Sequence, residues 1–258
     1  MLKSSLFYRL MKVLIIIPTY NEKRNIKEII EEIFQVDPHY HILVVDDNSP
    51  DKTAVIVKRL QKKYPNLNLI EREFREGLGP AYISGFNFVL KKKASRFDYI
   101  IQMDADFSHN PQMLPVLIGL ADNNHWVIAS RYVSGGKIKG WGIKRLLLSR
   151  LGNAYAKVVL GFQIKDWTSG FCCWPKKILA KINFKDANLP DGYAFQVAIK
   201  YRAREAGFKP IEIPITFKER RRGKSKMGVG IINEASVTIL RLWLGRKKHS
   251  SKKIRIAR

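Results

Sequence analysis

Two aspartates separated by one residue are the part of this sequence best suited to chemistry. Asp104 and Asp106 follow the apolar stretch Tyr99-Ile100-Ile101, which is typical of a buried strand. Carboxylate oxygens with this spacing can share one hard divalent cation, Mg2+ or Mn2+, and that cation can neutralise a diphosphate. Aspartates are also common in turns at strand ends, so the short pattern by itself leaves a purely structural role equally open.

Polar groups also follow each of the three preceding apolar stretches, at 18–22, 46–49 and 75–79. In an open α/β sheet, ligands bind at the edge formed by the carboxyl ends of the strands. We therefore expect these groups in one cleft, where acidic side chains bind ribose or base hydroxyls and Arg75 binds phosphate. Each has a structural alternative, because 46–49 suits a turn and Gly77 and Gly79 suit tight backbone geometry.

Strands and helices alternate along the part of the chain that must position these residues. Apolar, β-branched stretches predict strands at 13–17, 41–45, 67–71, 99–103, 126–130 and 210–217. Helical spacing predicts helices at 53–64, 80–93, 111–121 and 144–160, and one more whose N-cap is Asn21. This alternation predicts a mixed, mostly parallel α/β sheet with helices on both faces.

The charge of the chain is unusual for a protein of ordinary composition. With 47 Lys and Arg against 22 Asp and Glu, the net charge is +25. Such an excess favours a polyanionic partner, which can be nucleic acid, anionic lipid or a phosphorylated substrate.

The cysteines and the apolar segments indicate where the protein works. Cys172 and Cys173 are adjacent and form neither a disulfide framework nor a zinc-binding spacing, which fits a reducing, cytoplasmic compartment. The first ten residues lack the apolar core of a secretory signal. The stretch 229–244 is interrupted by polar residues and is shorter than about 20 apolar residues, so we expect no membrane-spanning helix.

The chain is expected to contain one domain with two short additions. Residues 1–11 form an N-terminal extension, and residues 12–244 form the α/β domain, including amphipathic helices at its C-terminal end. Residues 245–258 form a basic tail with little to bury, which we expect to be flexible.

An ordered series of motifs then identifies a family. The motifs lie at 18–22, 45–51, 77–79, 103–109, 130–136, 168–171, 192–196, 213–217 and 223–227. In sequence and order they resemble the family-2 glycosyltransferases of the GT-A fold, and most closely the dolichyl-phosphate and polyprenyl-phosphate mannose synthases. The resemblance extends over nearly everything from Lys12 to about Leu244.

The resemblance implies an enzyme that transfers mannose from GDP-mannose to a dolichyl or polyprenyl monophosphate, with inversion at the anomeric carbon. It implies Mg2+ or Mn2+ on Asp104 and Asp106, with Ser108 at a position where some relatives supply a Gln ligand. A hydroxyl is a weaker ligand or acts through water. The donor-binding residues implied are Pro18, Tyr20, Glu22, Asp47, Arg75, Asp104, Ala105 and Asp106.

The resemblance also implies a group of residues that binds the acceptor phosphate: Arg131, Arg145, Ser149, Arg220 and Lys226. The residues expected to be catalytic are Asp104, Asp106, Arg131 and Arg220. Arg220 is chosen from the 220–222 cluster by its spacing to Lys226. Many relatives carry an acidic residue where this chain has Ala198, so any role of that carboxylate is absent or has moved to Asp191.

A lipid acceptor has to be met at a bilayer surface. The segments 144–160 and 231–244 combine apolar and basic residues, which suits peripheral binding to the cytoplasmic face of a membrane. Packing on the core explains the same pattern equally well. Some relatives have transmembrane helices or membrane subunits, so a small integral membrane partner is left open.

Three other functions compete with this one. Transfer of glucose from UDP-glucose differs only by small contacts in the donor pocket. A basic nucleic-acid-binding protein would explain the charge, but the chain has no recognisable nucleic-acid module and acidic strand ends would repel phosphates. A Rossmann dehydrogenase would show G-x-G-x-x-G after the first strand, where this chain has Pro18-Thr19-Tyr20-Asn21-Glu22. We therefore expect no nucleic acid as a partner.

Overall fold

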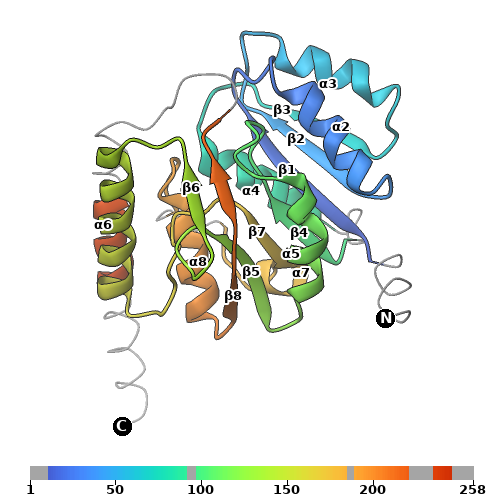
Figure 1. Cartoon of the computed structure of the whole chain (residues 1–258). Helices are drawn as coiled ribbons and strands as arrows, with labels where there is room; N and C mark the ends of the chain where they lie inside the picture. Colours follow the sequence, from blue (N-terminus) through green and yellow to red (C-terminus); the bar gives the residue numbers. More distant parts are fainter. Residues whose placement is uncertain (1–10, 92–96, 185–188, 221–234, 246–258) are drawn as a thin grey trace.

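One seven-stranded sheet forms the centre of the protein in the computed structural model (Figure 1). The structure describes residues 11–91, 97–184, 189–220 and 235–245. Nearly all of the predicted N-terminal extension and basic tail lies outside these residues, as do Lys226, Arg221 and Arg222.

The first part of the chain builds four parallel strands in the order β3-β2-β1-β4. The strands are β1 (Val13–Thr19), β2 (His41–Asp46), β3 (Leu67–Glu71) and β4 (Tyr99–Gln102). The helices between them are α2 (Ile26–Val36), α3 (Thr53–Gln61) and α4 (Leu78–Leu90). Residues of β1 are almost entirely buried, as expected of a central strand that is covered on both faces.

The second part extends the sheet as β4-β7-β5-β8. Its elements are η2 (Pro111–Met113), α5 (Leu114–Leu120), β5 (His125–Ser130), α6 (Ile143–Leu160), β7 (Cys172–Pro175), α7 (Lys176–Leu179), α8 (Phe195–Glu205) and β8 (Lys209–Pro214). β6 (Lys137–Lys139) and β9 (Thr216–Lys218) form a separate parallel pair. Residues 235–245 are helical.

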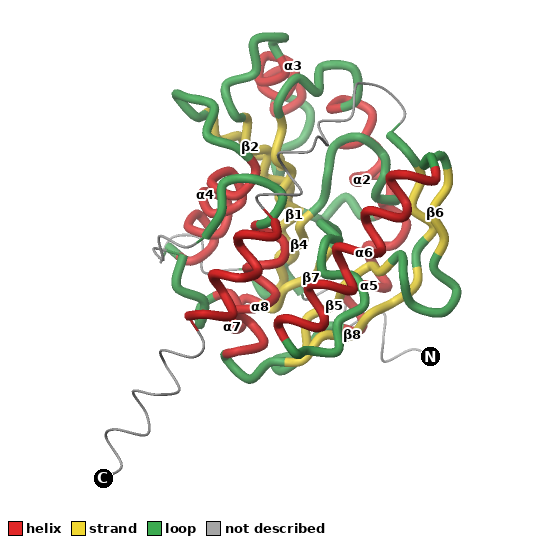
Figure 2. Tube along the Cα trace, turned by 90° about the vertical axis from the view of Figure 1, so that its left-hand side faces the viewer, coloured by secondary structure: helices red, strands yellow, loops and turns green. Residues whose placement is uncertain are grey.

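Helices cover both faces of the sheet, as predicted. Alternate strand residues belong to two apolar cores, because successive side chains in a strand point to opposite faces. Ile15 and Ile17 pack with α2, α3 and α5, whereas Leu14 and Ile16 pack with α4, α7 and α8. Figure 2 shows α6 in front of the sheet, on the side that also carries α8.

Two local predictions were wrong, and one strand was missed. Asn21 does not cap a helix: its φ is 60°, its backbone N–H binds Ser49 Oγ, and α2 begins after Asn25. The strand predicted at 210–217 is divided into β8 and β9, which belong to different sheets. β7 was not predicted, and it runs antiparallel to both of its neighbours, β4 and β5.

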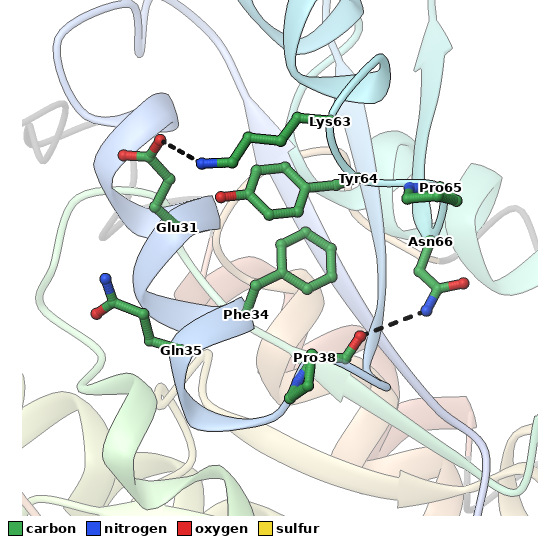
Figure 3. Close-up of a pocket in the computed structure, with 8 residues that line it drawn as sticks. All are labelled: Glu31, Phe34, Gln35, Pro38, Lys63, Tyr64, Pro65 and Asn66. Carbon is green, nitrogen blue, oxygen red and sulfur yellow. Dashed lines mark hydrogen bonds and ion pairs between the residues drawn. The ribbon is translucent and has the colours of Figure 1, made fainter.

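A shallow pocket lies at the edge of the sheet where β2 and β3 begin. It is lined by the end of α2 and by residues 63–66, and its volume is about 550 Å³. In Figure 3, Phe34 and Tyr64 stack inside it, with ring centroids 4.4 Å apart, and Lys63 approaches Glu31. This edge is opposite to the one where the strands end, so the pocket is separate from the residues selected for chemistry.

Candidate active site

The end of β4 brings both aspartates to the carboxyl edge of the sheet. The Asp104 side chain is 38% exposed, whereas that of Asp106 is 11% exposed. The backbone N–H of Asp104 donates to His109 Nδ1 at 3.0 Å, and Asp106 Oδ1 accepts from the backbone N–H of Ser108 at 3.1 Å. A left-handed residue, Phe107 with φ of 65°, allows the loop to turn back in this way. The backbone at Asp104 and the carboxylate of Asp106 are therefore held by their own loop.

An arginine from the chain just after β9 reaches the more buried aspartate. Arg220 Nη2 lies 3.5 Å from Asp106 Oδ2. Tyr193 is close to the same group: burial and the nearby Asp104 raise its pKa, and Arg220 opposes the rise. Among the three consecutive arginines, only Arg220 is within the described residues.

A second arginine comes from α6. Arg145 Nη1 forms an ion pair with Glu219 Oε2 at 2.5 Å, and its guanidinium stacks on the ring of Trp141. Burial lowers the pKa of Arg145, as do Arg220 and Arg131, while Glu219 opposes them. These cations therefore lie close enough to repel one another, and a bound anion would relieve the repulsion.

The third predicted arginine is engaged by an aspartate that sequence reasoning missed. Arg131 Nε and Nη2 donate to the two carboxylate oxygens of Asp166 at 2.8 and 2.6 Å, and Nη2 also donates to Thr168 Oγ1 at 2.6 Å. Asp166 is fully buried. Burial would raise the pKa of Asp166, but Arg131 outweighs burial and lowers it.

Another predicted acceptor residue is also part of a protein hydrogen bond. Ser149 Oγ, on α6, accepts from the hydroxyl of Tyr132 at 2.7 Å. Tyr132 follows Arg131, whose guanidinium lies 5.4 Å from the Tyr132 ring centroid. The structure thus places Arg131, Arg145, Ser149 and Arg220 around the same region and leaves Lys226 outside the described residues.

The end of β2 presents two adjacent aspartates that face different partners. Asp46 accepts from Thr19 Oγ1 and from Ser49, so it joins the ends of β1 and β2. Asp47 accepts from Arg72 Nη1 at 2.7 Å and from two backbone N–H groups at 76 and 77. The described contacts of Asp47 therefore organise the loop after β3.

The loop after β3 carries the predicted phosphate-binding arginine. The guanidinium of Arg75 lies 4.1 Å from the ring centroid of Tyr20, a residue from the loop after β1. Two residues predicted to bind the donor are thus brought together from separate strand ends. Glu22 accepts from Asn25 Nδ2, and its backbone N–H donates to Thr53 Oγ1. The Ala105 side chain is in the core, so only its backbone could meet a ligand.

Gly77 and Gly79 serve a close approach of two backbone segments. The backbone N–H of Gly79 donates to the carbonyl oxygen of Asp191 at 2.7 Å. A Cβ atom on Gly77 would lie 2.7 Å from the same oxygen, and one on Gly79 would lie 2.2 Å from the carbonyl oxygen of Pro190. The motif at 77–79 therefore packs against residues 190–191, which lead to Tyr193. The Asp191 side chain is exposed beside it.

The two aspartates suit a cation that completes its coordination with ligands from a substrate. Within the described ranges, no group of three or more His, Cys, Asp or Glu side chains is arranged to hold a metal. Mg2+ is commonly bound by one or two carboxylates together with substrate phosphates. Near Asp104, the buried carboxamide of Gln196 has no hydrogen-bond partner among the described residues. The site therefore has both carboxylate ligands and spare polar groups.

Known proteins match this chain over most of its length. The family described as "Glycosyl transferase family 2" matches residues 14–183. A "Polyprenol monophosphomannose synthase" of Mycolicibacterium smegmatis is 39% identical over 87% of this chain and 84% of its own length. An "Undecaprenyl-phosphate mannosyltransferase" of Micrococcus luteus is 38% identical over 90% of this chain and 93% of its own length.

Solved structures share the fold at lower identity. Glucosyl-3-phosphoglycerate synthase from Mycobacterium tuberculosis, in complex with phosphoglyceric acid, aligns with a TM-score of 0.63 at 17% identity. That alignment covers 92% of this chain and 80% of the other. The same enzyme in complex with Mn2+, UDP and glucosyl-3-phosphoglycerate aligns with a TM-score of 0.62. The predicted GT-A fold is thereby confirmed.

Proposed function

Because the chain belongs to glycosyl transferase family 2, we propose that it transfers mannose from GDP-mannose to the phosphate of a polyprenyl or dolichyl monophosphate. The two curated relatives, 38% and 39% identical, are named for mannosyl transfer of this kind. One observation carries the proposal: Arg220 pairs with Asp106 after β4, and Arg145 of α6 lies close enough to Arg220 for the two cations to repel each other. Such a site can receive a metal-bound diphosphate on one side and a second phosphate on the other.

On the donor side, Asp104 and Asp106 hold a divalent cation, Mg2+ or Mn2+, which supplies Lewis-acid stabilisation of the leaving diphosphate. Arg75, stacked on Tyr20, offers a cation to the donor. We assign Pro18 and Glu22 to the same donor-binding group. Asp47 acts through the loop that it binds. Ser108 contributes as a weak or water-mediated ligand.

On the acceptor side, the lipid phosphate is already an anion, so it needs little help from a general base. Arg145 and Arg220 bind this anion and align it with the anomeric carbon, and Arg131, Ser149 and Lys226 belong to the same group. One phosphate oxygen forms the new bond to C1 as the bond from C1 to the diphosphate oxygen breaks, so GDP leaves and the configuration inverts. Positioning and charge stabilisation then account for catalysis.

The outer surface of α6 suits a lipid acceptor. Arg145 and Ser149 face the site, whereas several large apolar side chains of the same helix are exposed: Ile143, Leu147, Leu148, Leu151 and Val158. The helix at 235–245 exposes Val237, Leu240 and Leu244. Among the described residues, no helix is both long enough and apolar enough to span a bilayer. We therefore place the protein on the cytoplasmic face of a membrane, held peripherally or by a small integral subunit.

The decisive experiment offers the purified protein a panel of radiolabelled nucleotide sugars together with a short polyprenyl phosphate and Mn2+. We expect lipid-linked label from GDP-mannose, and loss of that label in Asp106→Asn. Asp122→Asn is the matched control, since Asp122 pairs with His125 on the surface. Label from UDP-glucose alone would mean that the enzyme transfers glucose and not mannose. No label from any sugar, with salt-dependent retention on DNA, would overturn it.

A further inference from the structure

Helix α8 carries a lysine whose side chain is fully buried. Lys200 Nζ donates to the carbonyl oxygens of Ser169 at 2.6 Å, Trp167 at 2.9 Å and Gln196 at 3.3 Å. An ammonium group has three N–H donors, so these carbonyls account for all of them. A buried charge is costly unless it is hydrogen-bonded and compensated by opposite charges.

The surroundings of Lys200 provide part of that compensation. Burial lowers the pKa of Lys200, as does the nearby Arg131, while the carboxylates of Asp166 and Glu212 act in the opposite direction. Glu212, on β8, accepts the backbone N–H groups of Lys165 and Asp166 at 2.8 and 2.9 Å. Lys200 is therefore part of the same buried charge group that holds Arg131.

Two of the three carbonyls bound by Lys200 flank Thr168. Thr168 Oγ1 accepts from Arg131 Nη2 at 2.6 Å and from Asn153 Nδ2 at 3.2 Å. The backbone carbonyls on either side of Thr168 point to the ammonium group, so this cation fixes the peptide planes that orient the Thr168 side chain. One end of the loop at 167–170 therefore reaches the acceptor side of the site through Arg131.

The other end of this loop borders the donor side. A Cβ atom on Gly170 would lie 3.8 Å from Asp104 Oδ1, 3.6 Å from His109 Cε1 and 3.5 Å from Gln196 Nε2. These atoms therefore border the space beside Gly170. The next residue, Phe171, stacks on His109 with ring centroids 4.8 Å apart, and His109 Nδ1 accepts the backbone N–H of Asp104. A displacement of the loop would therefore be passed to Asp104 through His109.

We propose that Lys200 is a positioning residue: by binding the carbonyls of Trp167 and Ser169 it fixes the 167–170 loop, which sets Arg131 on one side of the site and Asp104 on the other. The assignment of these sides to acceptor and donor rests on the proposed function. The binding of the loop by Lys200 does not. Removal of an outer partner of a metal site typically costs about 10- to 100-fold in metal affinity or activity.

The test compares Lys200→Met, which removes the ammonium group at similar length, with Tyr201→Phe. Tyr201 is the next residue of α8 and is equally buried, but its hydroxyl binds Glu205 and the carbonyl of Leu242 and not the 167–170 loop. Both variants lose buried hydrogen bonds, so both should lower the melting temperature. Lys200→Gln, which keeps two N–H donors, is a second variant in case Lys200→Met does not fold.

The first measurement is hydrogen exchange of the 166–171 segment, where Trp167 and Thr168 donate their backbone N–H groups to Asn153 Oδ1. The second is calorimetric binding of Mn2+ with GDP, and the third is the split between kcat and KM for a short polyprenyl phosphate. We expect the Lys200 variants to exchange faster in this segment, to bind Mn2+ with GDP about tenfold more weakly and to show a raised acceptor KM. Tyr201→Phe should show none of these changes.

Wild-type exchange and affinity in the folded Lys200 variants would overturn the proposal, and so would the same changes in Tyr201→Phe. Hydrogen exchange requires no turnover. A wild-type protein that is inactive with every nucleotide sugar would therefore remove the proposed function while the exchange result still decides the role of Lys200.

Discussion

A methyl group at Gly79 tests the packing of the segment that leads to Tyr193. In Gly79→Ala the new Cβ would lie 2.2 Å from the carbonyl oxygen of Pro190 and 3.2 Å from Cα of Asp191. Both neighbours are backbone atoms, which cannot rotate away as a side chain could. The variant therefore has to displace the segment and lose the 2.7 Å hydrogen bond from Gly79 to Asp191.

The size of the effect follows from three contributions. Overpacking costs about 1–3 kcal/mol, and the lost hydrogen bond costs about 1 kcal/mol. Alanine recovers at most about 1 kcal/mol through its higher helix propensity. Gly79→Ala should thus lower the free energy of unfolding by about 1–3 kcal/mol. For a chain of this size, each 1 kcal/mol corresponds to roughly 2–4 °C in melting temperature.

Gly152→Ala provides the matched control, because Gly152 is also helical and none of the described atoms lies within 4 Å of its added Cβ. This variant should gain about 1 kcal/mol. Urea unfolding monitored by tryptophan fluorescence measures the stability of both variants. The KM for the nucleotide sugar shows whether the displaced segment also alters the site. Equal stability of the two variants would show that the contact between Gly79 and Asp191 is not formed in solution, and the account of the 77–79 motif would be wrong.

Four further outcomes are expected. Arg131→Ala should raise the acceptor KM more than the donor KM, in steady-state assays that vary each substrate in turn. Arg220→Gln should tighten Mn2+ binding several-fold in calorimetry without substrates, since removing a cation that pairs with Asp106 is worth about 1 kcal/mol or less. Because Arg131 outweighs burial and lowers the pKa of Asp166, the charged carboxylate stabilises the fold above about pH 4 and this stability is lost on acidification, so Asp166→Asn should flatten the acid limb of the unfolding curve. Leu147→Asp should reduce co-sedimentation with anionic vesicles.

Each of these predictions would be refuted by a specific result. An unchanged acceptor KM in Arg131→Ala would remove Arg131 from its assigned role. Unchanged Mn2+ affinity in Arg220→Gln would mean that its ion pair with Asp106 is not formed in solution. Identical acid unfolding of wild type and Asp166→Asn would mean that the ion pair with Arg131 is absent in solution. For the vesicle assay, Val116→Asp is the control, because Val116 is 46% exposed on α5, away from α6.

Local sequence signals predicted the first half of the fold well. The stretches at 41–45 and 67–71 are β-branched or apolar and are bounded by turn residues, and both became parallel strands. β7 was missed because Cys172–Pro175 is only four residues long and its antiparallel insertion depends on partners far away in the chain. Asn21 was misread because a capping residue is recognised from the helix start, and the chain adds four residues before α2 begins.

The site was predictable where residues follow strands and obscure where they pair over long distances. Asp104 and Asp106 were selected by their spacing together with the polar groups that follow the three preceding strands. Asp166 lies in a loop and Lys200 lies on α8, and neither has an oppositely charged residue at a spacing that would indicate an ion pair. The pair formed by Asp166 with Arg131 spans 35 residues. The only available signal was their position beside the motifs at 168–171 and 192–196, which did not indicate buried charge.

The late arrival of β7 has a consequence for synthesis on the ribosome. A nascent chain that has emerged as far as β4 can assemble four parallel strands, but the outer side of β4 finds its neighbour only when residues 172–175 appear. Until then that unpaired edge is open to association with other chains, so chaperone capture during translation should concentrate on intermediates about 100 to 175 residues long.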